Sequence, residues 1–156
     1  MNQQYRGSRR WTAFLALALP LGGVACDEDP FGLGPGPTID AVVGSYDAAD
    51  AFGAFSFTTT DDGETTNWLA AGAEFVISLY ADGSTSGRLF IPGPDEDDSD
   101  MDVDLTGSWS LSGSTVTFEH AADTFVRDMP FTFNSGTLVG DRTFSGVRVQ
   151  VVLVRQ

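Results

Sequence analysis

The stretch DVDLTGSWSLSGSTVTFE, residues 102–119, decides the fold. Its apolar side chains alternate with Asp, Ser and Thr on both sides of Ser112-Gly113. Alternation with a period of two places one set of side chains in a core and the other in water, as in a β-strand with one buried face. A Ser-Gly pair between two such runs is a hairpin signal. The stretch therefore predicts two antiparallel strands, 102–111 and 114–119, joined by a tight turn.

The same alternation recurs along the chain and predicts further strands near 44–59, 74–80, 84–91, 129–133, 137–140 and from 147 to 153. We expect hairpin turns at Asp61-Asp62-Gly63, at Asp82-Gly83 (type I′) and at Ser135-Gly136. Only two short stretches look helical, Ile39–Val43 and Ala121–Phe125. About eight short strands joined by tight turns predict an all-β domain, a small antiparallel up-and-down barrel, because closure removes the exposed sheet edges.

Residues 1–25 have the organisation of a secretory signal peptide. Arg6, Arg9 and Arg10 precede the apolar run Trp11–Ala25, which ends on small residues. The run is too short for a transmembrane helix, which needs about 20 apolar residues to cross the bilayer.

The segment Gly22–Cys26 (GGVAC) resembles the lipobox of bacterial lipoproteins, although Gly23 stands where that pattern usually has Leu. The resemblance implies that lipid is attached to the Cys26 sulfur and that the chain is cut before it. Cys26 is also the only cysteine. The expected location is therefore the bacterial cell envelope, with the protein anchored through Cys26 on the extracytoplasmic side of the inner or the outer membrane; the alternative is an ordinary signal peptide with a chance cysteine.

The lipidated Cys26 is followed by DEDPFGLGPGPT, residues 27–38, which is rich in Gly, Pro and acid and predicts a flexible tether. The sequence thus divides into a signal peptide (1–25), a lipidated tether (26–38) and a β-barrel domain (39–156).

The charge of the chain limits its partners. Three of the eight basic residues precede residue 26, so five arginines remain against 22 acids after cleavage, a formal charge of −17. Nucleic-acid binding needs clusters of Lys and Arg, and docking on anionic lipid headgroups needs basic patches. We therefore expect neither nucleic-acid binding nor electrostatic attachment to a membrane.

Two motifs of the domain are similar to lipocalins. Ile39–Tyr46 (IDAVVGSY) resembles the helical turn and Gly-x-Trp that open the first lipocalin strand, with Tyr46 in the place of Trp. Leu105–Trp109 (LTGSW) resembles segments of bacterial lipocalin-like lipoprotein domains. The resemblance implies an eight-stranded barrel that holds a small apolar ligand at its mouth; such a barrel can equally be filled by its own side chains.

The sequence offers no catalytic set. His120 is the only histidine, Cys26 is consumed by lipid, and no Gly-x-Ser-x-Gly elbow is present. We expect His120 to be a surface residue at a strand end, and we expect neither an enzyme nor a cofactor.

The acidic run Pro94–Asp104 (PDEDDSDMDVD) is a candidate cation site. Asp98, Asp100, Asp102 and Asp104 recur at every second position, so they share one side wherever the run is extended. A solvated acidic loop is the preferred interpretation. A weak calcium site is the alternative, because calcium takes six to eight oxygen ligands.

Trp68 and Leu69, in the loop-like stretch Glu64–Gly72, are candidate contacts for an apolar ligand at the barrel mouth, and Tyr46 is a third candidate. The same pair could instead plug the mouth. Trp109 is expected in the core. The functional expectation is a non-enzymatic, lipid-anchored envelope protein that binds a small apolar ligand or an envelope partner; the alternative is a structural or interaction module with a filled barrel.

Overall fold

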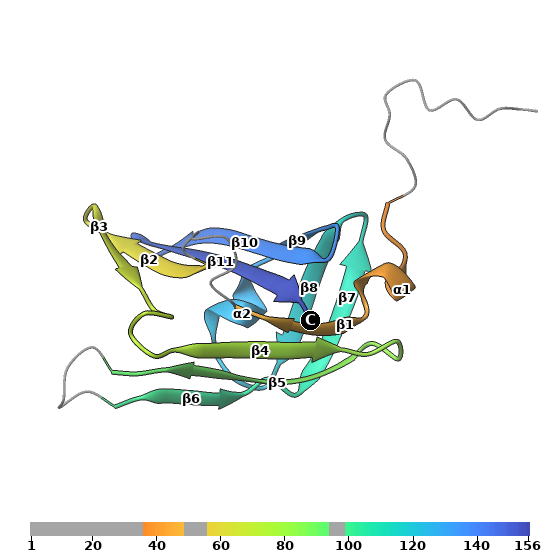
Figure 1. Ribbon diagram of the computed structural model, residues 1–156, viewed down its shortest axis with the longest axis horizontal. Coiled ribbons are helices and arrows are strands. Elements are labelled where there is room, and N and C mark those ends of the chain that lie inside the picture. Colours follow the sequence, from red (N-terminus) through yellow and green to blue (C-terminus); the bar gives the residue numbers. More distant parts are fainter. Residues whose placement is uncertain (1–35, 49–55, 94–98) are drawn as a thin grey trace, which may run out of the picture. The chain divides into compact units, whose positions relative to one another are not determined.

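Eleven β-strands and two short helices make up the residues that the computed structural model describes, which are 36–48, 56–93 and 99–156 (Figure 1). In chain order the elements are α1 (Ile39–Val42), β1 (Gly44–Asp47), β2 (Phe57–Asp61), β3 (Glu64–Asn67), β4 (Glu74–Leu79), β5 (Ser84–Ile91), β6 (Met101–Asp104), β7 (Gly107–Ser112), β8 (Thr115–His120), α2 (Phe125–Asp128), β9 (Phe131–Asn134), β10 (Thr137–Phe144) and β11 (Val147–Arg155). All the strand pairs among them are antiparallel.

Eight of these strands close a barrel. Each pairs with the next in the order β1–β4–β5–β7–β8–β9–β10–β11, and β11 returns to β1 with Tyr46 opposite Arg155. The predicted all-β, lipocalin-like antiparallel barrel is therefore confirmed. Closure pairs the first strand with the last, so neither is left as an open edge over this part of the barrel.

Two strands that the sequence predicts as continuous are each broken in two. The stretch predicted near 44–59 forms β1 and β2, which pair with successive parts of β11; residues 49–55 lie outside the described part. The stretch predicted at 102–111 forms β6 and β7, which pair with successive parts of β5. Between β6 and β7 the Asp104 carboxylate accepts the Thr106 backbone N–H at 2.6 Å, a local bond that turns the chain out of the ladder.

The stretch Glu64–Gly72 is not wholly a loop, because its first four residues form β3 on the edge of β2. Asp62 and Gly63 both have positive φ, 47° and 86°, as a type I′ turn requires. The type I′ turn expected at Asp82-Gly83 is wrong, because only Gly83 has a positive φ. The Tyr80 N–H donates to the Ser84 carbonyl at 3.0 Å, so this loop holds three residues and ends on a left-handed glycine.

Two further boundaries differ from the sequence-based expectation. The second helix begins at Phe125, not at Ala121. The strand predicted at 137–140 continues to Phe144, because Ser145 and Gly146 have φ of 49° and 99° and make a hairpin turn to β11. This turn was not among the expected ones.

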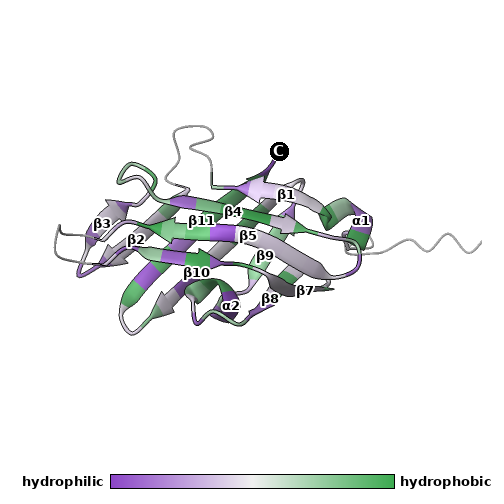
Figure 2. Ribbon diagram, turned by 90° about the horizontal axis from the view of Figure 1, so that it is seen from below, coloured by the Kyte–Doolittle hydropathy of each residue, from purple (hydrophilic) through white to green (hydrophobic). Residues whose placement is uncertain are grey.

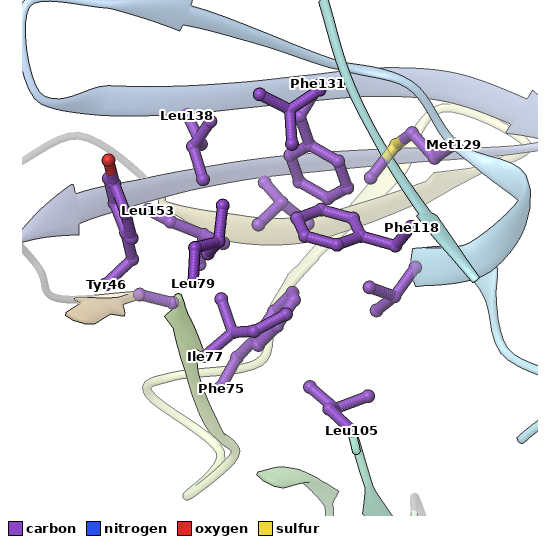
Figure 3. Close-up of a cluster of buried hydrophobic side chains, with 14 of the residues drawn as sticks. Tyr46, Phe75, Ile77, Leu79, Leu105, Phe118, Met129, Phe131, Leu138 and Leu153 are labelled. Carbon is purple, nitrogen blue, oxygen red and sulfur yellow. The ribbon is translucent and has the colours of Figure 1, made fainter. Parts of the chain in front are cut away.

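The barrel is filled by its own side chains. Apolar stripes cross its strands (Figure 2), and their side chains meet in one cluster inside the sheet (Figure 3). The largest fully buried side chains are those of Tyr46, Phe57, Phe75, Ile77, Leu79, Leu89, Leu105, Phe118, Met129, Phe131, Leu138 and Leu153. A filled interior is one of the two outcomes open to an eight-stranded barrel.

Trp109 belongs to this core, as expected. Its side chain is 7% exposed and lies opposite Phe118 in the β7–β8 register. The indole N–H donates to the Tyr80 carbonyl at 2.9 Å, which satisfies the polar atom of a buried tryptophan.

Arg155 fastens the first helix to one end of the barrel. Its guanidinium donates to the carbonyls of Ala41 and Val43, beyond which the chain enters β1. The same group lies 5.7 Å from the centre of the Tyr46 ring, within reach of a cation–π interaction. Tyr46 is fully buried, and its hydroxyl donates to the Val42 carbonyl.

Candidate functional site

The barrel splits at the end away from α1. β3 pairs only with β2, and β6 only with β5, so the sheet is not continuous from β3 to β4 or beyond β6. Figure 1 shows the β2–β3 hairpin and the β5–β6 strands lying apart at this end. The strand pairing therefore leaves the barrel open here, although its centre is packed.

An apolar pocket of about 270 Å³ lies between the separated strands. It is lined by Phe57, Thr59, Trp68, Ile91, Pro92, Gly93, Ser99, Met101, Phe125 and Val149. These residues come from four parts of the fold, namely the β2–β3 hairpin, the ends of β5 and β6, the start of α2, and β11. None of the lining side chains is titratable.

Three phenylalanine rings pack together at this pocket. Phe57 and Phe125, which line it, have ring centres 5.6 Å apart, and Phe75 lies 6.3 Å from Phe57 and 6.2 Å from Phe125. Tilted and edge-to-face pairs at these distances are favourable aromatic contacts. Phe57 and Phe75 belong to the buried core and Phe125 packs against it, so the floor of the pocket is apolar and continuous with the core.

Trp68 and Thr59 form one wall. The Trp68 indole N–H donates to the Thr59 hydroxyl at 3.0 Å, so neither polar group is left unpaired at the apolar surface. Both residues also line a second, wider hollow of about 620 Å³, which Asp61, Thr66 and Val147 border as well. The two hollows share Pro92 and Gly93, so they adjoin.

The sequence-predicted ligand contacts fall in different places. Trp68 lines the pocket. Leu69 is half-buried against the core and is not among the lining residues. Tyr46 lies with Arg155 and α1 at the other end of the barrel, so the structure does not bring it to this pocket.

Sequence reasoning missed most of the lining. Alternation puts Phe57 and Val149 on inward faces, but it does not reveal where the sheet separates. Ile91, Met101 and Phe125 lie at element ends, where the periodic signal fades. The site is located by the pairing of β3 and of β6 with one neighbouring strand each, which alternation along the sequence does not reveal.

The candidate calcium ligands do not form a cluster in the described part. Asp98 lies outside it. The Asp100 carboxylate accepts the Gly93 N–H at 3.0 Å, and both oxygens of Asp102 accept from Arg88 at 2.8 and 2.9 Å. Among the described residues, no three His, Cys, Asp or Glu side chains lie together as a metal would need.

Arg88 and Thr106 favour the charged form of two of these carboxylates. The hydrogen bonds from Arg88 lower the pKa of Asp102, and those from Thr106 lower the pKa of Asp104. Each of these carboxylates thus already has a partner within the barrel.

The expectation that His120 is a surface residue is wrong. Its side chain is 6% exposed, stacks on the Phe118 ring at 5.6 Å between centres, and has Nε2 3.2 Å from the Thr85 hydroxyl. That hydroxyl donates to the Leu105 carbonyl at 2.8 Å, so it accepts from an Nε2–H, and Nδ1 is left without a partner. Burial lowers the pKa of His120, with an opposing effect from Asp104. The strand ends here, but Thr85 of β5 and Gly107 of β7 lie against the ring and cover it.

Cys26 lies outside the described residues. Within residues 36–48, 56–93 and 99–156, neither helix is long and apolar enough to cross a membrane.

The chain matches no known protein family, no curated protein and no solved structure in the three comparisons made. Its class is therefore given by its fold: an all-β protein with a closed, lipocalin-like antiparallel barrel. The particular feature of this barrel is a filled centre with an apolar pocket at the mouth where the sheet splits.

Proposed function

We propose that this chain is a lipid-anchored, non-enzymatic protein of the bacterial cell envelope that binds a small apolar ligand at the split mouth of its barrel. One observation carries the binding proposal, namely the pocket of about 270 Å³ between the β2–β3 hairpin and the β5–β6 strands. Ligand sites are typically concave and apolar, with a few polar groups that fix orientation, and Thr59 and Ser99 are such groups here.

The lining supports binding over catalysis. General acid–base chemistry needs a titratable side chain within hydrogen-bonding reach of the reacting group. None lines this pocket, and His120 lies with β5 and β7, in contact with neither hollow. The same lining favours a molecule held by its apolar surface.

The envelope location is supported by the signal peptide and the lipobox-like Gly22–Cys26 segment. Two acyl chains anchor a protein stably, whereas one chain binds only marginally. Lipid on Cys26 would keep the barrel at the membrane surface, where apolar molecules partition.

A structural or interaction module is the second candidate, and the filled barrel favours it. About a dozen large side chains occupy the interior, and the pocket lies slightly below the usual range for drug-sized ligands, about 300–1,000 Å³. In that case the mouth would contact an envelope protein in place of a small molecule.

Binding of an uncharged phenylnaphthylamine dye, which fluoresces when it leaves water, tests the proposal. Ser99→Phe adds a ring at the exposed edge of the pocket, and we expect it to weaken dye binding about tenfold or more, equivalent to about 1.4 kcal/mol. Ser112→Phe makes the same change at the exposed end of β7 and should leave the affinity unchanged. Equal affinity in both variants, or no saturable binding by the parent chain, would favour the structural module.

A further inference from the structure

The polarity of the site rises in steps along β2. Phe57, Thr59 and Asp61 occupy alternate positions and so share one face of the strand. Phe57 lines only the apolar pocket, Thr59 lines both hollows, and Asp61 lines only the outer one. A molecule lying along this face would meet a ring, then a hydroxyl, then a carboxylate.

A second carboxylate stands beside Asp61. Glu64 is its direct partner in the β2–β3 register, so the two side chains project from the same face. Directly opposed like charges on neighbouring strands destabilise the pair. Among the described residues neither carboxylate has an ion-pair partner. The rim of the outer hollow therefore carries two negative charges, and a bound cation would reduce the repulsion between them.

The basic side chains of the domain do not line the two hollows at this mouth. The chain has no lysine, and its five arginines beyond residue 26 are all engaged elsewhere. Three of them form ion pairs: Arg88 with Glu74 and Asp102, Arg127 with Asp123 and Asp128, and Arg148 with Asp141. The other two donate to backbone carbonyls: Arg142 to that of Asp128, and Arg155 to those of Ala41 and Val43. None of them lines either hollow.

We infer that the site takes a single-chain amphiphile with a cationic head, its hydrocarbon chain in the apolar pocket and its ammonium group at Asp61 and Glu64. The inference rests on the proposed function of the same pocket and names the class of ligand. A fatty acid or a phosphate headgroup would place its negative charge against two carboxylates, with no arginine among the residues that line the hollows.

The chain and the head should contribute separately. Each added methylene should tighten binding about three- to fourfold until the pocket is full. A single charge pair near 4 Å in water is worth about fivefold, so an alkylamine should bind about fivefold or more tighter than the alcohol of the same length at low salt. Added salt should reduce that preference, because exposed charges are screened.

Calorimetric titration of the full chain carrying Cys26→Ser, with decylamine, decanol and decanoate below their micelle concentrations, tests the inference. The expected order of affinity is amine, then alcohol, then carboxylate. The double variant Asp61→Asn, Glu64→Gln should bring the amine to the affinity of the alcohol and leave the alcohol unchanged. Both positions are exposed, so the variant should fold.

A double variant with the same change in net charge provides the control. Asp40→Asn with Glu119→Gln alters two exposed acids on α1 and β8, away from the mouth, and should preserve the preference for the amine. If it abolishes the preference, the effect comes from net charge and the inference is overturned.

The remaining outcomes separate the two proposals. Equal binding of all three amphiphiles, or tightest binding of decanoate, overturns the cationic head and leaves an apolar site. No saturable binding of any of them by the parent chain contradicts the proposed function as well.

Discussion

Trp109 and Trp68 are held by different surroundings, and their removal should cost different amounts. Trp109 is buried on the inner face of β7, opposite Phe118 of β8, so Trp109→Ala should lower the free energy of unfolding by about 3–5 kcal/mol. Trp68 is half-buried with one hydrogen bond to Thr59, so Trp68→Ala should cost about 1–2 kcal/mol. Denaturant melts of the two variants measure both values; an equal or larger cost at Trp68 would mean that the assigned core is wrong.

His120 should make the barrel less stable in mild acid. Its folded-state pKa is lowered, so below the unfolded value of 6.5 the unfolded chain binds more protons than the folded one. Stability should therefore fall as the pH drops from 6.5 towards the lowered pKa, and His120→Gln should remove this slope. The lowered carboxylate pKa values act in a separate window, below about 4. Melts at steps between pH 7 and 5 decide the point; the same slope in parent and variant would assign it to another group.

Trp109 and His120 show how far the burial of a single side chain can be predicted from the sequence. Trp109 sits in the middle of an unbroken alternating run, so its burial follows from the sequence. His120 follows the same alternation, since Val116 and Phe118 precede it, yet its position at a strand end suggested exposure. Its cover comes from Thr85 and Gly107 on neighbouring strands, and alternation along one strand does not reveal such contacts.

At the scale of elements, the sequence predicted the positions of the hairpins better than it predicted the lengths of the strands. The Asp62-Gly63 and Ser135-Gly136 turns have the positive φ values that such pairs favour. The break between β6 and β7, Leu105-Thr106, contains no glycine or proline, so alternation runs through it unbroken. The break between β1 and β2 includes residues 49–55, which lie outside the described part. Because β1 and β2 pair with different parts of β11, and β6 and β7 with different parts of β5, the sheet is not continuous at the mouth.

The β6 carboxylates should not respond to calcium beyond ionic strength. Asp102 accepts hydrogen bonds from Arg88, and Asp104 accepts one from the Thr106 N–H. A calcium ion would have to replace these bonds to bind either carboxylate. Calcium should therefore raise the melting temperature no more than sodium chloride of the same ionic strength does. A calcium-specific rise that disappears when Asp98, Asp100, Asp102 and Asp104 are changed to Asn would support the alternative site, since ligand at 100 times its dissociation constant adds about 2.7 kcal/mol.

For the whole molecule, closure of the barrel follows from the number of strands and their short connections, whereas the pocket does not. Its walls come from β2, β5, β6, β11 and α2, and their convergence depends on long-range pairing. The proposed lipid anchor rests on the sequence that precedes the barrel, so it is tested separately from the pocket.

Cys26→Ser should abolish membrane association, because the lipobox-like segment supplies the only lipid attachment that the sequence indicates. Cells labelled with an alkyne fatty acid and then fractionated provide the readout. The parent should carry label and sediment with membranes, and the variant should do neither. A variant that still sediments, or a parent without label, would contradict the anchor.

Native mass spectrometry of the protein released from its own membranes tests the central claim most directly. The parent chain should retain a bound molecule in addition to its covalent lipid. Ser99→Phe should lose that molecule and Ser112→Phe should keep it. A parent chain that carries nothing beyond the covalent lipid, or an adduct that all three chains retain equally, would contradict a ligand site at the mouth of the barrel.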